Sequence, residues 1–158
     1  MADTNAPVTR RRFCAGACQA ASGATLATLF SGCGGGSSPT SPSGMPGSLG
    51  VLPGVLIGSV VQVPTAGSPL TDVGGAVLVE STAGVFLLSR TSASSFTAID
   101  AVCTHEGCTI TTADGADYVC PCHGSRYTRS GQVLAGPAKA ALRQYVATFA
   151  DGVVTIAL

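Results

Sequence analysis

The sequence predicts an all-β domain that occupies residues 51–158. Glycine is abundant, with 21 residues, and tryptophan is absent. Small and β-branched residues dominate the second half of the chain, a composition that suits short strands joined by turns. No segment after residue 50 carries apolar residues at the 3.6-residue helical period over three turns. The sequence therefore favours strands over helices throughout this domain.

Short apolar runs separated by turn residues mark the expected strands. In chain order they are 55–63, which stops at Pro64, then 76–80 and 85–90 joined by a hairpin turn at 81–84, then 96–102, and finally 145–150 and 153–158. The last two runs flank Asp151-Gly152, which is a strong signal for a two-residue hairpin. No internal repeat is apparent.

Charged residues make up only 10% of the chain, and eight Lys and Arg balance eight Asp and Glu. Nucleic-acid binding needs a positive field around the protein, so nucleic acid is not an expected partner. Arg10, Arg11 and Arg12 fall in the first dozen residues, and the rest of the chain is slightly acidic.

Residues 1–33 have the pattern of an export signal. Arg10 and Arg11 precede Phe13 in the manner of a bacterial twin-arginine signal, and an uncharged, mildly apolar run follows from 14 to 30. This run is short for a membrane span, which needs roughly 20 predominantly apolar residues. A retained N-terminal membrane anchor is the alternative interpretation.

The segment 29–33 resembles a bacterial lipobox, in which Cys33 would become the lipidated first residue of the mature protein. An incidental cysteine at the end of a spent signal is the alternative. Residues 34–50 are almost wholly Gly, Ser, Pro and Thr, a composition typical of a flexible linker. We therefore expect a folded domain that is exported to the periplasm and tethered on the outer side of the cytoplasmic membrane.

The two histidines of the chain and four of its seven cysteines gather in one short window. The window holds two blocks, 103–108 (C-T-H-E-G-C) and 120–125 (C-P-C-H-G-S). One cysteine and one histidine from each block would give a [2Fe–2S] cluster two thiolates on one iron and two imidazoles on the other. The candidate ligands are Cys103, His105, Cys120 and His123. Such a ligand set gives potentials of roughly −150 to +300 mV, against about −400 mV for plant-type ferredoxins.

The same window leaves two questions open, namely which metal the four candidate ligands bind and what state the other two cysteines adopt. Two Cys and two His also suit tetrahedral zinc, so a zinc-binding module is a competing hypothesis. Cys108 and Cys122 remain as one spare cysteine in each block. A disulfide between them would join the two blocks, and an exported location would permit it. Two free thiols are the alternative.

The two blocks resemble those of the Rieske iron–sulfur proteins of cytochrome bc-type complexes, the branch that carries an extra disulfide. The resemblance covers roughly 96–142. It implies a Rieske-like antiparallel β-sandwich with a small cluster-binding subdomain formed by two loops. It also implies that Ser125 and Tyr127 donate hydrogen bonds to the cluster and its ligand thiolate, and that Gly136, Pro137 and Ala138 form a covering loop. A turn serine, a packed tyrosine and a plain surface turn are the alternatives.

These observations predict one-electron transfer and no substrate chemistry of the chain's own, because no nucleophile paired with a base lies outside the ligand set. The resemblance implies an iron–sulfur subunit of a quinol-oxidising cytochrome complex, or of a related oxidoreductase similar to arsenite oxidase. Cytochromes of b or c type, or an oxidoreductase large subunit, would be the partners. Glu106 stands where bc-complex members usually have leucine, and Thr128 replaces a common acidic residue. A free-standing periplasmic electron carrier is therefore the alternative.

Overall fold

The computed structural model describes residues 46–158. In this range the chain forms short β-strands and a single three-residue 3-10 helix, η1 (Pro69–Thr71). The predicted all-β class is confirmed. Within the same range, no helix has the length and apolar character that a membrane crossing requires. The predicted export signal with Arg10 and Arg11, the lipidation site Cys33 and most of the linker 34–50 lie outside the described residues.

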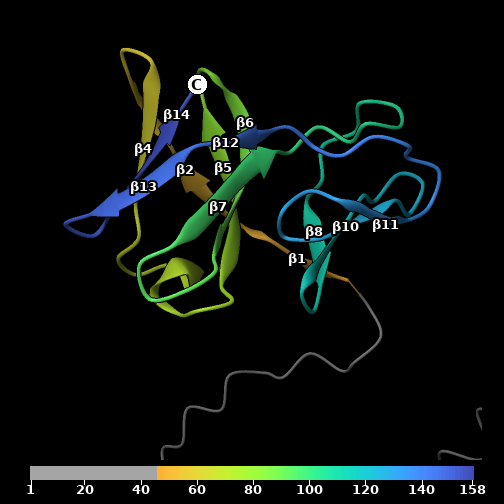
Figure 1. Ribbon diagram of the computed structural model, residues 1–158, viewed down its shortest axis with the longest axis horizontal. Coiled ribbons are helices and arrows are strands. Elements are labelled where there is room, and N and C mark those ends of the chain that lie inside the picture. Colours follow the sequence, from red (N-terminus) through yellow and green to blue (C-terminus); the bar gives the residue numbers. More distant parts are fainter. Residues whose placement is uncertain (1–45) are drawn as a thin grey trace, which may run out of the picture. The chain divides into compact units, whose positions relative to one another are not determined.

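The strands form three sheets, which Figure 1 shows as three groups of arrows. The first sheet has the order β1 (Gly47–Ser48), β8 (Thr112–Asp114), β9 (Asp117–Val119), β10 (Arg126–Tyr127) and β11 (Val133–Ala135). The second has the order β12 (Gln144–Tyr145), β7 (Phe96–Asp100), β6 (Gly84–Arg90), β5 (Ala76–Ser81) and β2 (Gly50–Pro53). The third has the order β13 (Ala147–Ala150), β14 (Val153–Ala157), β4 (Val60–Pro64) and β3 (Val55–Ile57). All pairs are antiparallel except β2 with β5, which is parallel.

The second sheet is central because both of its faces are buried. On β6, Leu87 packs into one core cluster, while its neighbours Phe86 and Leu88 pack into another. On β5, Leu78 faces the first cluster and the residues on either side of it face the second. A strand buried on both faces needs apolar residues at consecutive positions, which explains the unbroken runs in 76–79 and 85–88. The second cluster lies against the third sheet, and the first contains the candidate ligands Cys103 and Cys120.

The predicted hairpins at 81–84 and at Asp151-Gly152 are both present. Asp151 and Gly152 have positive φ values of 50° and 77°, as a tight two-residue turn requires. The expected strand 55–63 is instead a hairpin, β3–β4, because Gly58 with φ 60° reverses the chain. The expected strand 145–150 is also divided: β12 belongs to the central sheet and β13 to the third.

Strand pairing begins at Gly47, inside the range expected for the linker. Gly47 and Ser48 in β1 pair with Ala113 and Thr112 in β8, and the Leu49 N–H donates to the carbonyl of Thr111 over 2.8 Å. The chain then enters β2 and pairs with β5 of the central sheet. The segment 47–53 therefore connects the sheet that carries the candidate ligands to the rest of the domain.

Candidate metal centre

Two loops of closely similar backbone geometry carry the candidate ligands. In the first loop, the Cys103 N–H donates to the Cys108 carbonyl and the Gly107 N–H donates to the Cys103 carbonyl, both over 2.9 Å. In the second, the Cys120 N–H donates to the Ser125 carbonyl over 2.8 Å and the Gly124 N–H to the Cys120 carbonyl over 3.0 Å. Each loop thus closes on its first cysteine. Each also depends on a glycine with positive φ, 76° at Gly107 and 71° at Gly124.

The loops bury their cysteine side chains and leave their histidine side chains closer to solvent. Cys103 and Cys120 are each only 2% exposed, and both belong to the same core cluster. The side chains of His105 and His123 are 27% and 49% exposed. The two imidazole rings lie edge to face, with centroids 5.0 Å apart. The structure therefore brings the four predicted ligands together as two inner thiols and two outer imidazoles.

The hydroxyl of Tyr127 contacts the buried end of this site. Its Oη lies 3.2 Å from Cys103 Sγ. Burial acts to raise the pKa of the Cys103 thiol, but hydrogen bonds from Tyr127 and from the His105 backbone outweigh it, so that pKa is lowered. Burial raises the pKa of Cys120, and Cys103 beside it raises that pKa further. Burial also raises the pKa of Tyr127, so its hydroxyl keeps its proton and remains a donor.

Ser125 connects the site to the loop that contains Gly136, Pro137 and Ala138. Its hydroxyl, which is fully buried, accepts from the Ala138 N–H over 3.2 Å, and it also acts to lower the pKa of the Cys103 thiol. Gly136 has φ 92°, and a Cβ there would lie 2.6 Å from Ser125 Cα. Only glycine allows this close approach of the two backbones. The loop predicted to cover the cluster therefore packs directly on the backbone of Ser125.

Replacing Gly136 with alanine is expected to destabilise the domain by roughly 2–5 kcal/mol. About 1–2 kcal/mol comes from the left-handed backbone conformation, and about 1–3 kcal/mol from overpacking against the backbone of Ser125. Gly115→Ala is the matched control, because Gly115 also has positive φ, 56°, but its Cβ would meet nothing within 4 Å. Denaturant unfolding of both variants measures the difference. Equal losses in the two variants would contradict the steric argument.

Cys108 and Cys122 form a disulfide, which confirms the pairing of the two spare cysteines. The bond joins the two candidate ligand loops across 14 residues of sequence. Cys122 is exposed and Cys108 partly buried, so the bond lies near the surface of the site, while the two free thiols in the described part of the chain are buried. The disulfide therefore ties the loops to each other independently of any metal.

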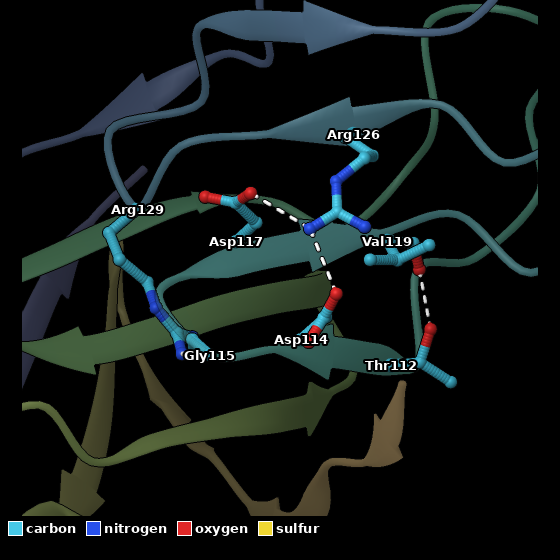
Figure 2. Close-up of polar contacts among 7 residues, drawn as sticks. All are labelled: Thr112, Asp114, Gly115, Asp117, Val119, Arg126 and Arg129. Carbon is cyan, nitrogen blue, oxygen red and sulfur yellow. Dashed lines mark hydrogen bonds and ion pairs between the residues drawn. The ribbon is translucent and has the colours of Figure 1, made fainter. Parts of the chain in front are cut away.

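An ion-pair cluster holds β10, the strand that carries Tyr127. The Nη2 of Arg126 donates to Asp114 Oδ2 over 3.0 Å and to Asp117 Oδ2 over 2.9 Å, as Figure 2 shows. Side chains alternate along a strand, so Arg126 points away from the face that Ser125 and Tyr127 share. The two aspartates hold the pKa of Arg126 above its usual value. The cluster thus fixes β10 to the β8–β9 hairpin that leads into Cys120.

Replacing Arg126 with methionine is expected to lower the denaturant midpoint modestly, because the ion pairs are partly exposed and screened by solvent. The contribution of Arg126 to stability is fully present below the unfolded pKa of an arginine, and it is lost only as pH rises through the raised folded pKa. The guanidinium of Arg126 does not titrate between about pH 7 and 10. Its effect on the difference in denaturant midpoint between wild type and variant should therefore stay constant over that range. It should shrink in 1 M NaCl, where the Debye length is about 3 Å. A difference that salt does not change would contradict an ionic origin.

Sequence reasoning did not identify Arg126, Asp114, Asp117 or Thr104 as parts of this site. Thr104 lies in the first loop, and its hydroxyl contacts both Tyr127 and the Ala140 carbonyl. The sequence did contain a signal for the ion-pair cluster. Asp114 and Asp117 stand on either side of a tight hairpin turn, and Arg126 follows on the next strand. No local signal could show that Thr104 reaches a loop 36 residues further along.

The donor set fits a cluster with two sulfur and two nitrogen ligands. Among the described residues, His105 Nδ1 is buried and has no hydrogen-bond partner, and the free cysteines are Cys103 and Cys120. A buried nitrogen without a partner is costly unless something else binds it. Two thiols and two imidazoles that converge from two loops match the ligands of a Rieske centre.

The family model for the Rieske [2Fe–2S] domain matches residues 57–146. The chain belongs to the Rieske [2Fe–2S] domain family. It is similar to the cytochrome b6-f complex iron–sulfur subunit of Chlorobaculum tepidum, with 40% identity over 65 residues that cover 40% of this chain and 36% of that protein. The subunit of the same description from Prochlorococcus marinus strain MIT 9211 is 51% identical over 45 residues, which cover 28% and 25% of the two chains. The match thus spans about a third or less of the length of these curated relatives.

A ferredoxin from Sphingomonas yanoikuyae B1 has the same fold. It is 24% identical, with a TM-score of 0.50 over 60% of this chain and 93% of the ferredoxin. This Rieske protein is related to the iron–sulfur subunits of cytochrome b6-f complexes. The cofactor prediction is confirmed at the level of the family, and the zinc hypothesis is set aside.

Proposed function

We propose that Cys103, Cys120, His105 and His123 hold the [2Fe–2S] cluster and that the chain carries single electrons on the outer side of the cytoplasmic membrane. The observation that carries this proposal is the pairing of two buried thiols with two adjacent, partly exposed imidazoles. When bound, the cluster supplies one-electron oxidation and reduction. The residues of the chain anchor it, set its environment and present one end of it to a partner.

Each residue of the site has a distinct part in this proposal. Cys103 and Cys120 anchor the buried end, and His105 and His123 form the end nearest to solvent, where a redox partner would approach. Tyr127 and Ser125 donate hydrogen bonds to sulfur atoms. These hydrogen bonds stabilise the negative charge that reduction adds, and so raise the reduction potential of the cluster. The loop of Gly136, Pro137 and Ala138 covers the site through its hydrogen bond to Ser125.

The related b6-f subunits support a place in a quinol-oxidising cytochrome complex or a related oxidoreductase, with a b- or c-type cytochrome or an oxidoreductase large subunit as partner. Glu106 favours a second candidate, a free-standing periplasmic carrier. Its carboxylate is 60% exposed and lies 3.6 Å from His123 Nδ1 and 4.0 Å from His105 Nε2. It gives the exposed tip an acidic group where quinol-oxidising relatives usually carry an apolar one.

The twin-arginine pattern at Arg10 and Arg11 supports export of the folded protein, and Cys33 followed by the linker 34–50 supports a lipid tether. Mass spectrometry of the mature N-terminus tests this part of the proposal. A diacylated Cys33 at the N-terminus would establish the lipid tether, and an intact leader would instead establish the retained anchor.

Three measurements on the purified full-length chain test the central proposal. Two iron and two sulfide per chain are expected, together with a Rieske electron paramagnetic resonance signal in the reduced state. A potential in the range of roughly −150 to +300 mV is expected from the ligand set. Bound zinc without iron would refute the proposal. Affinity capture from membranes then separates the two candidates, since co-purification of a cytochrome b supports the complex and its absence supports the carrier.

A further inference from the structure

The hydroxyl of Thr104 lies between the first ligand loop and the loop that follows Ala138. Its Oγ1 donates to the Ala140 carbonyl over 2.6 Å and lies 3.1 Å from Tyr127 Oη. A carbonyl oxygen can only accept, and a threonine hydroxyl has one proton. The Thr104 proton is therefore committed to Ala140, and between Thr104 and Tyr127 the tyrosine must be the donor.

Tyr127 also has only one proton, and two acceptors lie within its reach. Thr104 Oγ1 lies at 3.1 Å and Cys103 Sγ at 3.2 Å. The Thr104 N–H donates to Tyr127 Oη over 3.3 Å, which occupies one lone pair of the hydroxyl oxygen. A metal-bound cysteine is a thiolate and has no proton to return. The single Tyr127 proton is thus divided between the ligand sulfur and the threonine oxygen.

The hydrogen bond from Thr104 to the Ala140 carbonyl makes Thr104 Oγ1 a stronger competitor with Cys103 Sγ for the Tyr127 proton. A hydroxyl that donates a hydrogen bond becomes a better acceptor, because the bonds in a chain polarise one another. This chain of hydrogen bonds runs from the Tyr127 hydroxyl through the Thr104 hydroxyl to the Ala140 carbonyl. It draws the Tyr127 proton away from Cys103 Sγ.

We propose that Thr104 is a positioning residue that lowers the reduction potential by competing with Cys103 for the hydroxyl proton of Tyr127. Hydrogen bonds to ligand sulfur raise the potential of an iron–sulfur cluster, so a residue that diverts such a bond lowers it. The inference deepens the proposed function and rests on it, because it requires Cys103 to be a cluster ligand.

Thr104→Val removes the hydroxyl and keeps the branched shape of the side chain. The Ala140 carbonyl lies at an exposed contact, so water can replace the lost donor. The midpoint potential of the full-length holoprotein, followed by its electron paramagnetic resonance signal, should rise in this variant. Thr104→Ser keeps the hydroxyl and should match wild type. Thr104→Ala provides the same readout if the valine variant does not fold.

A double-mutant cycle with Tyr127→Phe separates the proposed competition from a structural effect. Tyr127→Phe should lower the potential, and Thr104→Val should then have no further effect in the phenylalanine background. A fall in potential in Thr104→Val, a rise in Thr104→Ser, or equal shifts in both backgrounds would overturn the inference. These outcomes leave the proposed function intact, because the cluster signal is present in each of them. Wild-type protein without a Rieske signal would instead overturn the proposed function.

Discussion

Cys103→Ser is expected to abolish cluster binding while the domain stays folded. A serine hydroxyl does not ionise near neutral pH as a thiol beside Tyr127 can, and thiolates are the sulfur-side ligands of the centre. Cys103 is 2% exposed within the same core cluster as Tyr127 and Ile99. A buried hydroxyl there would cost about 1–3 kcal/mol, which is below the usual stability of a domain. Iron and sulfide content, the electron paramagnetic resonance signal and circular dichroism measure the outcome.

The matched control is Val102→Ser, which places the same side chain one position earlier in the same loop. Val102 is 43% exposed and is not a candidate ligand, so this variant should keep full iron content and an unchanged signal. Cys120→Ser should repeat the result of Cys103→Ser from the other loop. A Cys103→Ser protein with wild-type iron and signal would show that the ligand assignment is wrong.

Replacing both Cys108 and Cys122 with serine is expected to destabilise the protein by about 3 kcal/mol in the chain-entropy model for a loop of this length. The same change removes the covalent connection between the two ligand loops. Iron should therefore be lost much faster, because each loop can then move away from the other. Guanidinium unfolding gives the stability, and the decay of visible absorbance in the presence of a chelator gives the rate of iron loss.

A reductant provides the control for this experiment. Cys122 is exposed, so dithiothreitol should bring wild-type protein to the behaviour of the double variant and leave the double variant unchanged. If the double variant matched oxidised wild type in both stability and iron loss, the disulfide would have no part in holding the loops together.

We expect the unfolding stability of the domain and the reduction potential of the cluster to depend on different groups in this site. The disulfide, the Arg126 ion pairs and the close approach of Gly136 to Ser125 hold the loops in place. Tyr127 contacts Cys103 Sγ and Thr104 Oγ1, and we propose that these groups, together with Ser125, act on the reduction potential. Substitutions in the first group are therefore expected to change stability more than potential, and those in the second group to do the reverse.

The candidate ligands could be predicted from the sequence because the chemistry of the cluster demands particular residue types at short spacings. Two thiols and two imidazoles must converge, and each loop supplies one of each within four residues, together with a glycine that closes the turn. The all-β class and the hairpins at 81–84 and Asp151-Gly152 could be predicted for the same reason, since their signals are local.

The divisions of the strands were not predictable from their apolar content. Runs 55–63 and 145–150 have strand composition throughout, yet the first turns back at Gly58 and the second passes between two sheets. The turn at Gly58 divides the first run into the hairpin β3–β4. A distant partner divides the second run, because β12 pairs with β7 of the central sheet.

The sequence by itself determined the class of the fold and the types and order of the candidate ligands. The tertiary structure alone decided that the central sheet is buried on both faces, that β1 joins the sheet of the candidate ligands, and that Thr104 lies between Tyr127 and Ala140. The physical reason is the range of the interactions. A turn or a ligand loop closes within a few residues, whereas the neighbours of Thr104 are brought to it by strands that pair across the whole domain.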